Sequence, residues 1–337
     1  MTTFTQICPP PPSFTEDNLI DLSSKVYLIT GATAGIGHHL ATLLYTLHAT
    51  VYIGARSLSH YTTAITTIQA AAPTSKGILK PFIADLSSLQ TIKPAVSTFQ
   101  AAEYRLDVLF LNAGVMTPVP DSKTINGYDL EIGTNCLASF LLVSLLQPMM
   151  QNVASHFCHP NQSIRVVWVS SLLNVSTPHG GVQFDENGAP KQLKGMENYM
   201  QSKAGVYLLA QEFSRRQKNT KDSSSSTAIN ESSYGNPHGV LHISLNPGHV
   251  KTELQGNALS PMRLIMGVVS KGPRYGAYTE LFAGLAPGVN DGNFVIPWGR
   301  KGNVPDHIAA STKARNGGKS VSAIFYEWCE QQIQPFV

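Results

Sequence analysis

A tyrosine and a lysine four residues apart, Tyr199 and Lys203, are the residues of this sequence whose spacing most directly indicates chemistry. On a helix, residues with this spacing lie on one face, within reach of each other. A phenol has a pKa near 10 and is a poor acid–base catalyst near neutrality, but a neighbouring ammonium favours the phenolate. Of the twelve tyrosines, only Tyr199 has a lysine four residues later. Because chance alone would produce about half a match in such a chain, the spacing needs support from position.

Three further polar residues could complete such a site. Ser170 and Ser171 follow an apolar run, and a serine at the carboxyl edge of a sheet could polarise a substrate carbonyl while Tyr199 passes the proton. The alternative for Ser171 is a strand-end cap. Asn135 is a poor helix former within a predicted helix, so it needs a partner if it is buried. A water relay to Lys203 would supply that partner, and a satisfied structural role is the alternative.

A glycine-rich turn, TGATAGIG at 30–37, follows a strand-like run and precedes an apolar helix. Backbone free of side chains and the positive end of a helix dipole are what a dinucleotide pyrophosphate needs. We therefore expect the turn to bind a cofactor, with an ordinary tight turn as the alternative. The cofactor-binding residues predicted in this turn are Gly31, Thr33, Gly35, Ile36 and Gly37.

The end of the second predicted strand bears on which dinucleotide is bound. An NAD enzyme usually places a carboxylate there, whereas Arg56 stands in this sequence with no acidic neighbour. This favours NADP(H) over NAD(H), with Arg56 on the 2′-phosphate; a solvent-exposed arginine is the alternative. Asp85 and Leu86 could line the adenine end, and the run 112–114 (Asn112, Ala113, Gly114) could continue the same pocket, although each could also be a plain turn.

Strands and helices alternate along most of the chain. Apolar runs predict strands at 25–30, 51–54, 78–84, 107–111, 164–170, 240–246 and 294–297, and helices at about 36–48, 58–72, 87–102, 127–150 and 197–218. This alternation predicts an α/β fold: one doubly wound parallel sheet of about seven strands with helices on both faces. A proline-containing arm, 1–24, precedes a single domain, 25–337, and Phe14 and Leu19 could pin the arm to it. The Ser- and Asn-rich stretch 218–237 predicts a mobile loop.

Composition excludes several other classes. The net charge of +3 over 337 residues, with scattered basic residues, argues against a nucleic-acid-binding protein. Four widely separated cysteines indicate neither a disulfide framework nor a metal site. The first residues lack a secretory pattern, and the apolar run 140–150 is too short to span a membrane. We therefore expect a cytoplasmic protein without an integral membrane segment.

Together these motifs resemble the short-chain dehydrogenase/reductase family over about 25–297. The resemblance implies a Rossmann-type fold with strand order 3-2-1-4-5-6-7 and these roles: Tyr199 as acid–base, Lys203 lowering its pKa and holding the nicotinamide ribose, Ser171 fixing the carbonyl, and Asn135 as the relay. It also implies that Pro247, Gly248, Val250 and Thr252 lie beside the nicotinamide carboxamide. The segments 181–185 and 199–216 are similar to the retinol-dehydrogenase-like branch, and the arm is similar to that of filamentous-fungal reductases of specialised metabolites. Ala34, where many NADP members have a hydroxyl or basic residue, departs from the pattern.

The family's substrate lid would cover about 252–282, where Met, Leu, Ile and Val predict an apolar pocket. An ordinary packed helix is the alternative. We expect an NADP(H)-dependent oxidoreductase acting on a lipophilic ketone, aldehyde or alcohol. Two other hypotheses are a redox-neutral lyase, isomerase or cyclase on the same scaffold and a non-catalytic, NADP-sensing protein. The resemblance also suggests a homodimer formed through the helices at 127–150 and 197–218.

Overall fold

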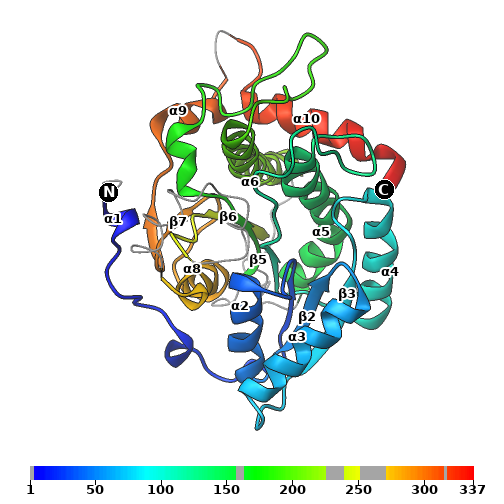
Figure 1. Ribbon diagram of the computed structural model, residues 1–337, viewed down its shortest axis with the longest axis vertical. Helices are drawn as coiled ribbons and strands as arrows, with labels where there is room; N and C mark the ends of the chain where they lie inside the picture. The colour runs from blue at the N-terminus through cyan, green and yellow to red at the C-terminus, as the bar shows by residue number, and fades with distance from the viewer. Residues whose placement is uncertain (1–3, 157–162, 225–238, 251–270, 315–316) are drawn as a thin grey trace.

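A single sheet of eight strands organises the molecule (Figure 1). The computed structural model describes residues 4–156, 163–224, 239–250, 271–314 and 317–337. The strand order is β3-β2-β1-β4-β5-β6-β7-β8, and all pairs from β3 to β7 are parallel. The strands are β1 (Val26–Ile29), β2 (Thr50–Ala55), β3 (Ile78–Ile83), β4 (Val108–Leu111), β5 (Ile164–Val169), β6 (Val240–Leu245), β7 (Phe294–Ile296) and β8 (Arg300–Gly302). The predicted fold class and order are confirmed.

The eighth strand was not predicted. β8 pairs antiparallel with β7 at the edge of the sheet. Its sequence, Arg-Lys-Gly, carries no apolar alternation, because an edge strand of three residues has little to bury. Only pairing with β7 defines it as a strand.

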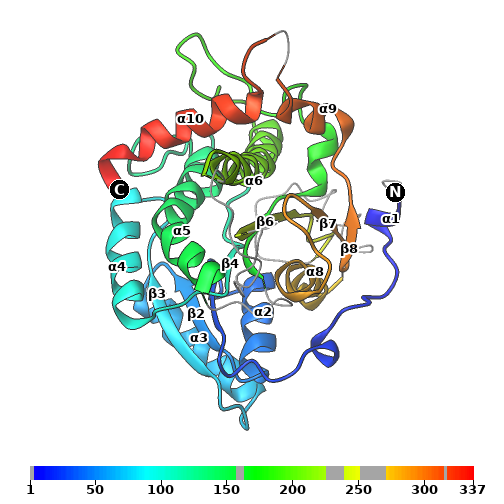
Figure 2. The same cartoon turned by 180° about the vertical axis from the view of Figure 1, so that it is seen from behind.

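Helices cover both faces of the sheet (Figures 1 and 2). One face carries α2 (Gly35–Thr46), α3 (Leu58–Ala71) and α8 (Pro273–Leu285), and the other carries α4 (Ile92–Ala102), α5 (Ala138–His156) and α6 (Met196–Ser224). In β1, Tyr27 and Ile29 pack in the core on the side of α2, α3 and α8. Val26 and Leu28 pack in the core on the opposite side, with α4, α5 and α6. This explains why the strands are continuously apolar, since successive side chains alternate between two buried faces.

Two predicted boundaries were wrong. α6 continues to Ser224 and covers the first seven residues of the predicted loop 218–237, because extending an existing helix costs little per residue. Residues 225–238 lie outside the described residues. The predicted lid also fails over 273–282: these residues belong to α8, a largely buried helix that packs beside α2 on the same face of the sheet. The rest of that prediction, 252–270, lies outside the described residues.

A C-terminal helix, α10 (Val321–Ile333), was also not predicted. It lies across α5 and α6 (Figure 1), and its Tyr326 ring packs edge-on against Phe140 and Phe213 at centroid distances of 4.8 and 4.9 Å. The segment 132–156 is, among the described residues, the one stretch long and apolar enough to cross a membrane, yet 72% of its apolar window is buried inside the fold. A core helix of a folded domain has this character.

The N-terminal arm is tied to the body at several points (Figure 2). Phe14 is buried and meets the ring of Phe282 on α8 edge-on at 5.9 Å, and Leu19 packs against the same core, as expected. Closer to the start of the chain, the buried Gln6 accepts a hydrogen bond at 3.1 Å from the side-chain amide of Asn246. The arm therefore contacts the segment that leads into Pro247.

Candidate active site

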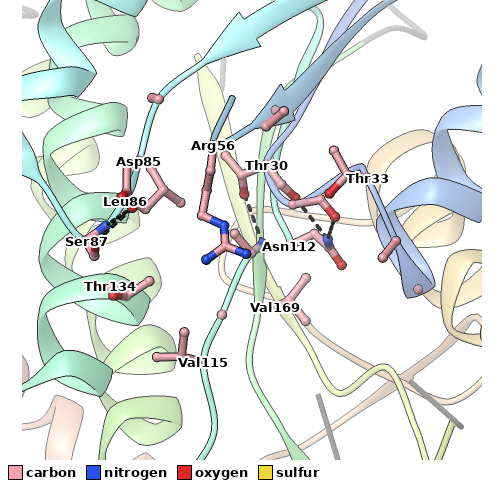
Figure 3. Close-up of a pocket in the computed structure, with 18 of the residues that line it drawn as sticks. Thr30, Thr33, Arg56, Asp85, Leu86, Ser87, Asn112, Val115, Thr134 and Val169 are labelled. Carbon is pink, nitrogen blue, oxygen red and sulfur yellow. Dashed lines mark hydrogen bonds between the residues drawn. The ribbon is translucent and has the colours of Figure 1, made fainter. Parts of the chain in front are cut away.

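One cleft of about 890 Å³ lies at the carboxyl edge of the sheet and brings together most of the predicted site residues (Figure 3). They come from opposite halves of the chain, since the carboxyl ends of parallel strands share one edge. The predicted residues that line the cleft are Gly31, Thr33, Gly35, Ile36, Arg56, Asp85, Leu86, Asn112, Ala113, Gly114, Tyr199, Lys203 and Pro247. The predicted residues Gly37, Asn135, Ser171, Gly248 and Val250 are described but do not line it, and Thr252 lies outside the described residues.

The glycine turn places the start of α2 at the cleft. Gly31 and Gly35 have φ angles of +64° and +57°, a conformation that side chains rarely adopt. Ala34 precedes the helix and offers no side-chain cap, so the N-cap residue leaves the first N–H groups of this twelve-residue helix available. Free N–H groups and a positive dipole end fit a bound phosphate.

Gly37 packs so closely against the glycine turn that a side chain would not fit. A Cβ at this position would lie 2.4 Å from the Asn112 amide nitrogen and 2.6 Å from the Gly31 carbonyl oxygen. That amide nitrogen donates to the carbonyl oxygens of Thr30 and Gly31, at 2.9 and 3.1 Å. Asn112 therefore holds the turn in shape and does not face a ligand with its amide nitrogen.

The adenine end of the cleft holds Arg56, which follows β2 and points into the pocket (Figure 3). Its side chain is exposed and makes no hydrogen bond or ion pair with the described residues. Asp85 accepts from the backbone N–H and the hydroxyl of Ser87, which closes a turn at the opposite wall. A guanidinium without a partner among the described residues thus points into this end of the cleft.

Tyr199 and Lys203 lie on one face of α6, with the Lys203 nitrogen 5.9 Å from the centre of the phenol ring. The ammonium donates to the Val169 carbonyl oxygen at 2.9 Å, and burial lowers the pKa of Lys203 to about 8. Burial raises the pKa of Tyr199; the negative charge of Glu131 also raises it, and a hydrogen bond with Ser171 lowers it. The expected lowering of the Tyr199 pKa is therefore wrong for this structure, because desolvation of the phenol is the larger effect.

The two serines have different surroundings. The Ser170 hydroxyl is buried, donates to the Lys203 carbonyl oxygen at 2.6 Å and accepts from Asn174 at 2.9 Å. The Ser171 hydroxyl accepts from the Leu173 N–H at 3.1 Å, as the cap of a short helical turn, and lowers the pKa of Tyr199. Ser170 thus fastens β5 to α6, whereas Ser171 is the hydroxyl next to the phenol.

Asn135 lies in a π-helical turn, Ile132–Leu137, immediately before α5. Its carbonyl oxygen accepts from the Val115 N–H at 2.8 Å, and its amide donates to the Val115 carbonyl and to the Ser202 hydroxyl. A Cβ added at Gly114 would meet the Asn135 oxygen and the Lys203 nitrogen, each at 3.1 Å. Asn135 and Lys203 therefore border the same small space. Irregular turns of this kind often occur at functional sites.

The segment after β6 forms another part of the site. Gly248, with a φ of +88°, donates to the Asn246 side-chain oxygen at 3.0 Å, and a Cβ there would touch Pro297. Val250 pairs with Lys271 through a single bridge. Pro247 is the residue of this segment that reaches the cleft.

Several cleft residues were not predicted from the sequence: Ser59, His60, Thr63, Ser87, Val115, Leu130, Thr134 and Val169. Thr134 has a buried hydroxyl without a hydrogen-bond partner among the described residues. Together with the uncapped start of α2, this orphaned hydroxyl indicates that the cleft is built to receive a polar ligand. These residues fit a dinucleotide.

Two buried carboxyls, Glu131 and Glu280, were also missed. Glu280 lies on the inner face of α8, is fully buried, and neither of its oxygens has a hydrogen-bond partner among the described residues. Burial raises its pKa to about 8, and the charge of Lys203 opposes this effect. No local sequence signal marks either residue, because each stands among other polar side chains in the sequence.

Replacing Glu280 with glutamine is expected to make stability less dependent on pH. The folded-state pKa is raised from 4.5 to about 8, so the stabilising protonated form is fully present below about pH 4.5 and is lost as the pH rises through about 8. At pH 8 the variant should exceed the wild type in free energy of unfolding by about 1–3 kcal/mol, with a smaller difference at pH 5. Urea unfolding at both pH values measures this.

The exposed Glu186 supplies the matched control. Glu186→Gln should follow the wild-type pH dependence. Equal slopes for the Glu280→Gln variant and the wild type would mean that Glu280 is solvated in solution.

Comparison with known proteins shows which proteins this chain resembles. The family model for short chain dehydrogenases matches residues 25–182. A short-chain dehydrogenase/reductase of Phomopsis amygdali is 38% identical over 98% of this chain and 96% of its own length.

Solved structures of the same fold hold either dinucleotide. The Pseudomonas aeruginosa RhlG/NADP active-site complex matches with a TM-score of 0.58 at 21% identity, over 82% of this chain and 95% of that one. A 3-ketoacyl-(acyl-carrier-protein) reductase from Brucella melitensis complexed with NADH matches with a TM-score of 0.57 at 19% identity, over 81% and 96%. At these identities the likeness concerns the fold, and the fold alone does not select the dinucleotide.

Proposed function

Because this chain belongs to the short-chain dehydrogenase/reductase family, we propose that it is an NADP(H)-dependent oxidoreductase of lipophilic carbonyl compounds or alcohols. The observation that carries the proposal is the convergence of Tyr199, Lys203, the glycine turn and the unpaired Arg56 on one cleft. This convergence supports the proposal because it combines a pair suited to proton transfer with groups suited to binding a phosphorylated dinucleotide.

Each group of cleft residues has its own role in the proposed reaction. The N-terminal N–H groups of α2 bind the pyrophosphate, and Arg56 binds the 2′-phosphate. The bound nicotinamide supplies or accepts a hydride at C4. In reduction, the Ser171 hydroxyl orients the substrate carbonyl, the Tyr199 hydroxyl gives its proton to the carbonyl oxygen, and the Lys203 ammonium stabilises the phenolate that remains.

The apolar part of the cleft supports a lipophilic substrate. Val115, Leu130 and Val169 line it near the tyrosine. Such a wall favours substrates that bury hydrocarbon over sugars or charged metabolites. The similarity to fungal family members supports a place in specialised metabolism.

An assay with purified protein tests the proposed activity. NADPH, NADH and a panel of lipophilic ketones and aldehydes are supplied, and both nicotinamide absorbance and products are followed. Formation of the alcohol with equimolar loss of NADPH is expected. Product without net change in nicotinamide absorbance would select a lyase, isomerase or cyclase, and tight NADP binding without turnover would select a binding protein.

Replacing Arg56 with alanine is expected to raise the KM for NADPH about tenfold, because a charge-assisted contact to the 2′-phosphate is lost. The KM for NADH should change little, so the same variant carries its own control. Steady-state kinetics with both cofactors measure the two values. An equal change for NADPH and NADH would remove Arg56 from the 2′-phosphate site.

The proposed homodimer meets a structural constraint. α10 packs on both α5 and α6, the helices that the resemblance assigned to the dimer contact. A dimer centred there would form over the outer surface of α10, and light scattering on the intact chain measures whether it does. The proposal also includes a cytoplasmic location, which microscopy of a tagged chain tests.

A further inference from the structure

A cluster of buried polar side chains lies directly beside the tyrosine. Asn198, the residue before Tyr199, is 4% exposed, and its amide nitrogen donates to the carboxylates of Glu131 at 2.8 Å and Asp129 at 2.9 Å. Its side-chain oxygen accepts from the Leu193 N–H at 3.1 Å. The backbone at the start of the catalytic helix is therefore held by two carboxylates.

Glu131 itself is 1% exposed and links two walls of the site. While one of its oxygens holds Asn198, the other accepts from the Thr117 N–H at 2.7 Å. Thr117 has a φ of +41°, uncommon for a residue with a side chain, and lies two residues beyond the cleft residue Val115. One carboxylate thus joins the loop after β4 to the helix that carries Tyr199.

The charge of Glu131 also acts on the catalytic pair. It raises the pKa of Tyr199 and the pKa of Lys203, since a negative charge opposes formation of the phenolate and favours the ammonium. Burial raises the pKa of Glu131, and hydrogen bonds from Asn198 and Thr117 lower it.

Few other charged groups surround Glu131. Asp129 lies on its own segment, and Tyr199 and Lys203 face it from α6. Helix α5 carries no Asp, Glu, Lys or Arg. Helix α10, packed behind the π-helical turn, contributes the buried Cys329, whose pKa is raised by burial, while its Glu327 pairs with Lys319 and Arg216.

We propose that Glu131 is a positioning residue that holds Tyr199 against the cleft and keeps the Tyr199–Lys203 pair in the proton-donating state that carbonyl reduction requires. This inference rests on the proposed function. In the reductive step a hydride from the reduced nicotinamide forms the new C–H bond, the carbonyl π electrons move to oxygen, and that oxygen takes the Tyr199 proton. Glu131 exchanges no proton in this step.

Two substitutions separate the charge of Glu131 from its geometry. Glu131→Gln removes the charge and keeps the length, whereas Glu131→Asp keeps the charge and shortens the reach. Reductive kcat/KM of the holoenzyme is measured against pH for each. For Glu131→Gln, loss of the charge lowers the pKa of both Tyr199 and Lys203, so the basic limb of the profile should move to lower pH by about one unit. For Glu131→Asp the limb should stay in place while kcat falls about tenfold or more.

Glu212→Gln is the matched control. Like Glu131, Glu212 is a carboxylate that is 1% exposed. It lies on α6 and pairs with Arg215 and Arg216 away from the cleft. This variant should lose stability without a shift in the pH profile. A shift in Glu131→Gln but not in Glu212→Gln therefore reports the charge beside the tyrosine, not the loss of a buried ion.

Two results would overturn the inference: a Glu131→Gln profile that superimposes on that of the wild type, or full kcat in Glu131→Asp. If Glu131→Gln fails to fold, Asn198→Ala tests the hydrogen bond through which Glu131 positions Tyr199. This variant should lower kcat without shifting the basic limb of the pH profile. An unchanged kcat in Asn198→Ala would also overturn the inference. Ultraviolet titration of the phenol, with Tyr199→Phe subtracted, measures the Tyr199 pKa without any substrate. Activity that survives in Tyr199→Phe would instead remove the proposed function, which keeps the two failures distinct.

Discussion

Replacing Tyr199 with phenylalanine is expected to lower kcat for carbonyl reduction by a factor of about 10²–10⁴, the usual contribution of a positioned acid. The ring is 6% exposed, and phenylalanine preserves its packing, so the fold and the cleft should remain. Only the hydroxyl next to Ser171 is lost, and with it the proton that the carbonyl oxygen must receive. Turnover with a proven substrate measures kcat, and calorimetry with NADPH measures whether the cofactor still binds.

Tyr207 provides a matched control for this substitution. It lies two turns further along α6, is 7% exposed, and packs its ring edge-on against Phe294 at 6.0 Å. Tyr207→Phe removes a buried phenol hydroxyl from the same helix but not from the cleft, so kcat should be within about twofold of the wild type. Comparable activity in the Tyr199→Phe and Tyr207→Phe variants would rule out Tyr199 as the acid.

The second large effect is expected for Gly37→Ala. The new methyl carbon would lie 2.4 Å from the Asn112 amide nitrogen and 2.6 Å from the Gly31 carbonyl oxygen, closer than atoms of this kind can approach. Relief requires movement of the turn, because Asn112 is itself fixed by two hydrogen bonds to that turn. We expect NADPH affinity to fall about 100-fold, equivalent to about 3 kcal/mol, with a loss of about 1–3 kcal/mol in the free energy of unfolding.

Gly272→Ala is the corresponding control. Gly272 precedes α8 with a φ of −64°, and none of the described residues lies within 4 Å of the position that its Cβ would take. Its substitution should leave NADPH binding and stability near those of the wild type. Titration calorimetry and urea unfolding compare the two variants. Normal NADPH affinity in Gly37→Ala would show that the turn can shift without affecting the cofactor.

The sequence was informative wherever the chemistry is local. The strand β1 could be predicted because residues 26–29 are apolar at every position, which suits a strand with two buried faces. The turn at 30–37 could be predicted because glycine is required where φ is positive and where backbone must lie bare. The Tyr199–Lys203 pair could be predicted because helical spacing alone places the two side chains on one face.

The tertiary structure decided features of the site that local sequence patterns could not predict. Asn135 could be predicted to need a partner, but Val115 and Ser202 became its partners only because the loop after β4 and the helix α6 both reach it in the fold. The helix α8 took the place of part of an expected lid, since the sheet face beneath it had to be covered.

The alternation of strands and helices, the glycine turn and the catalytic spacing were thus determined by the sequence itself, because each follows from steric and periodic rules that act over a few residues. The electrostatic character of the site was decided by the tertiary structure. Glu131 and Glu280 are ordinary glutamates in the sequence, and they act on Lys203 only because folding buries them near it, where charges interact strongly. Burial likewise raises the pKa of Tyr199, and the spacing of residues along one helix does not reveal whether a side chain is buried.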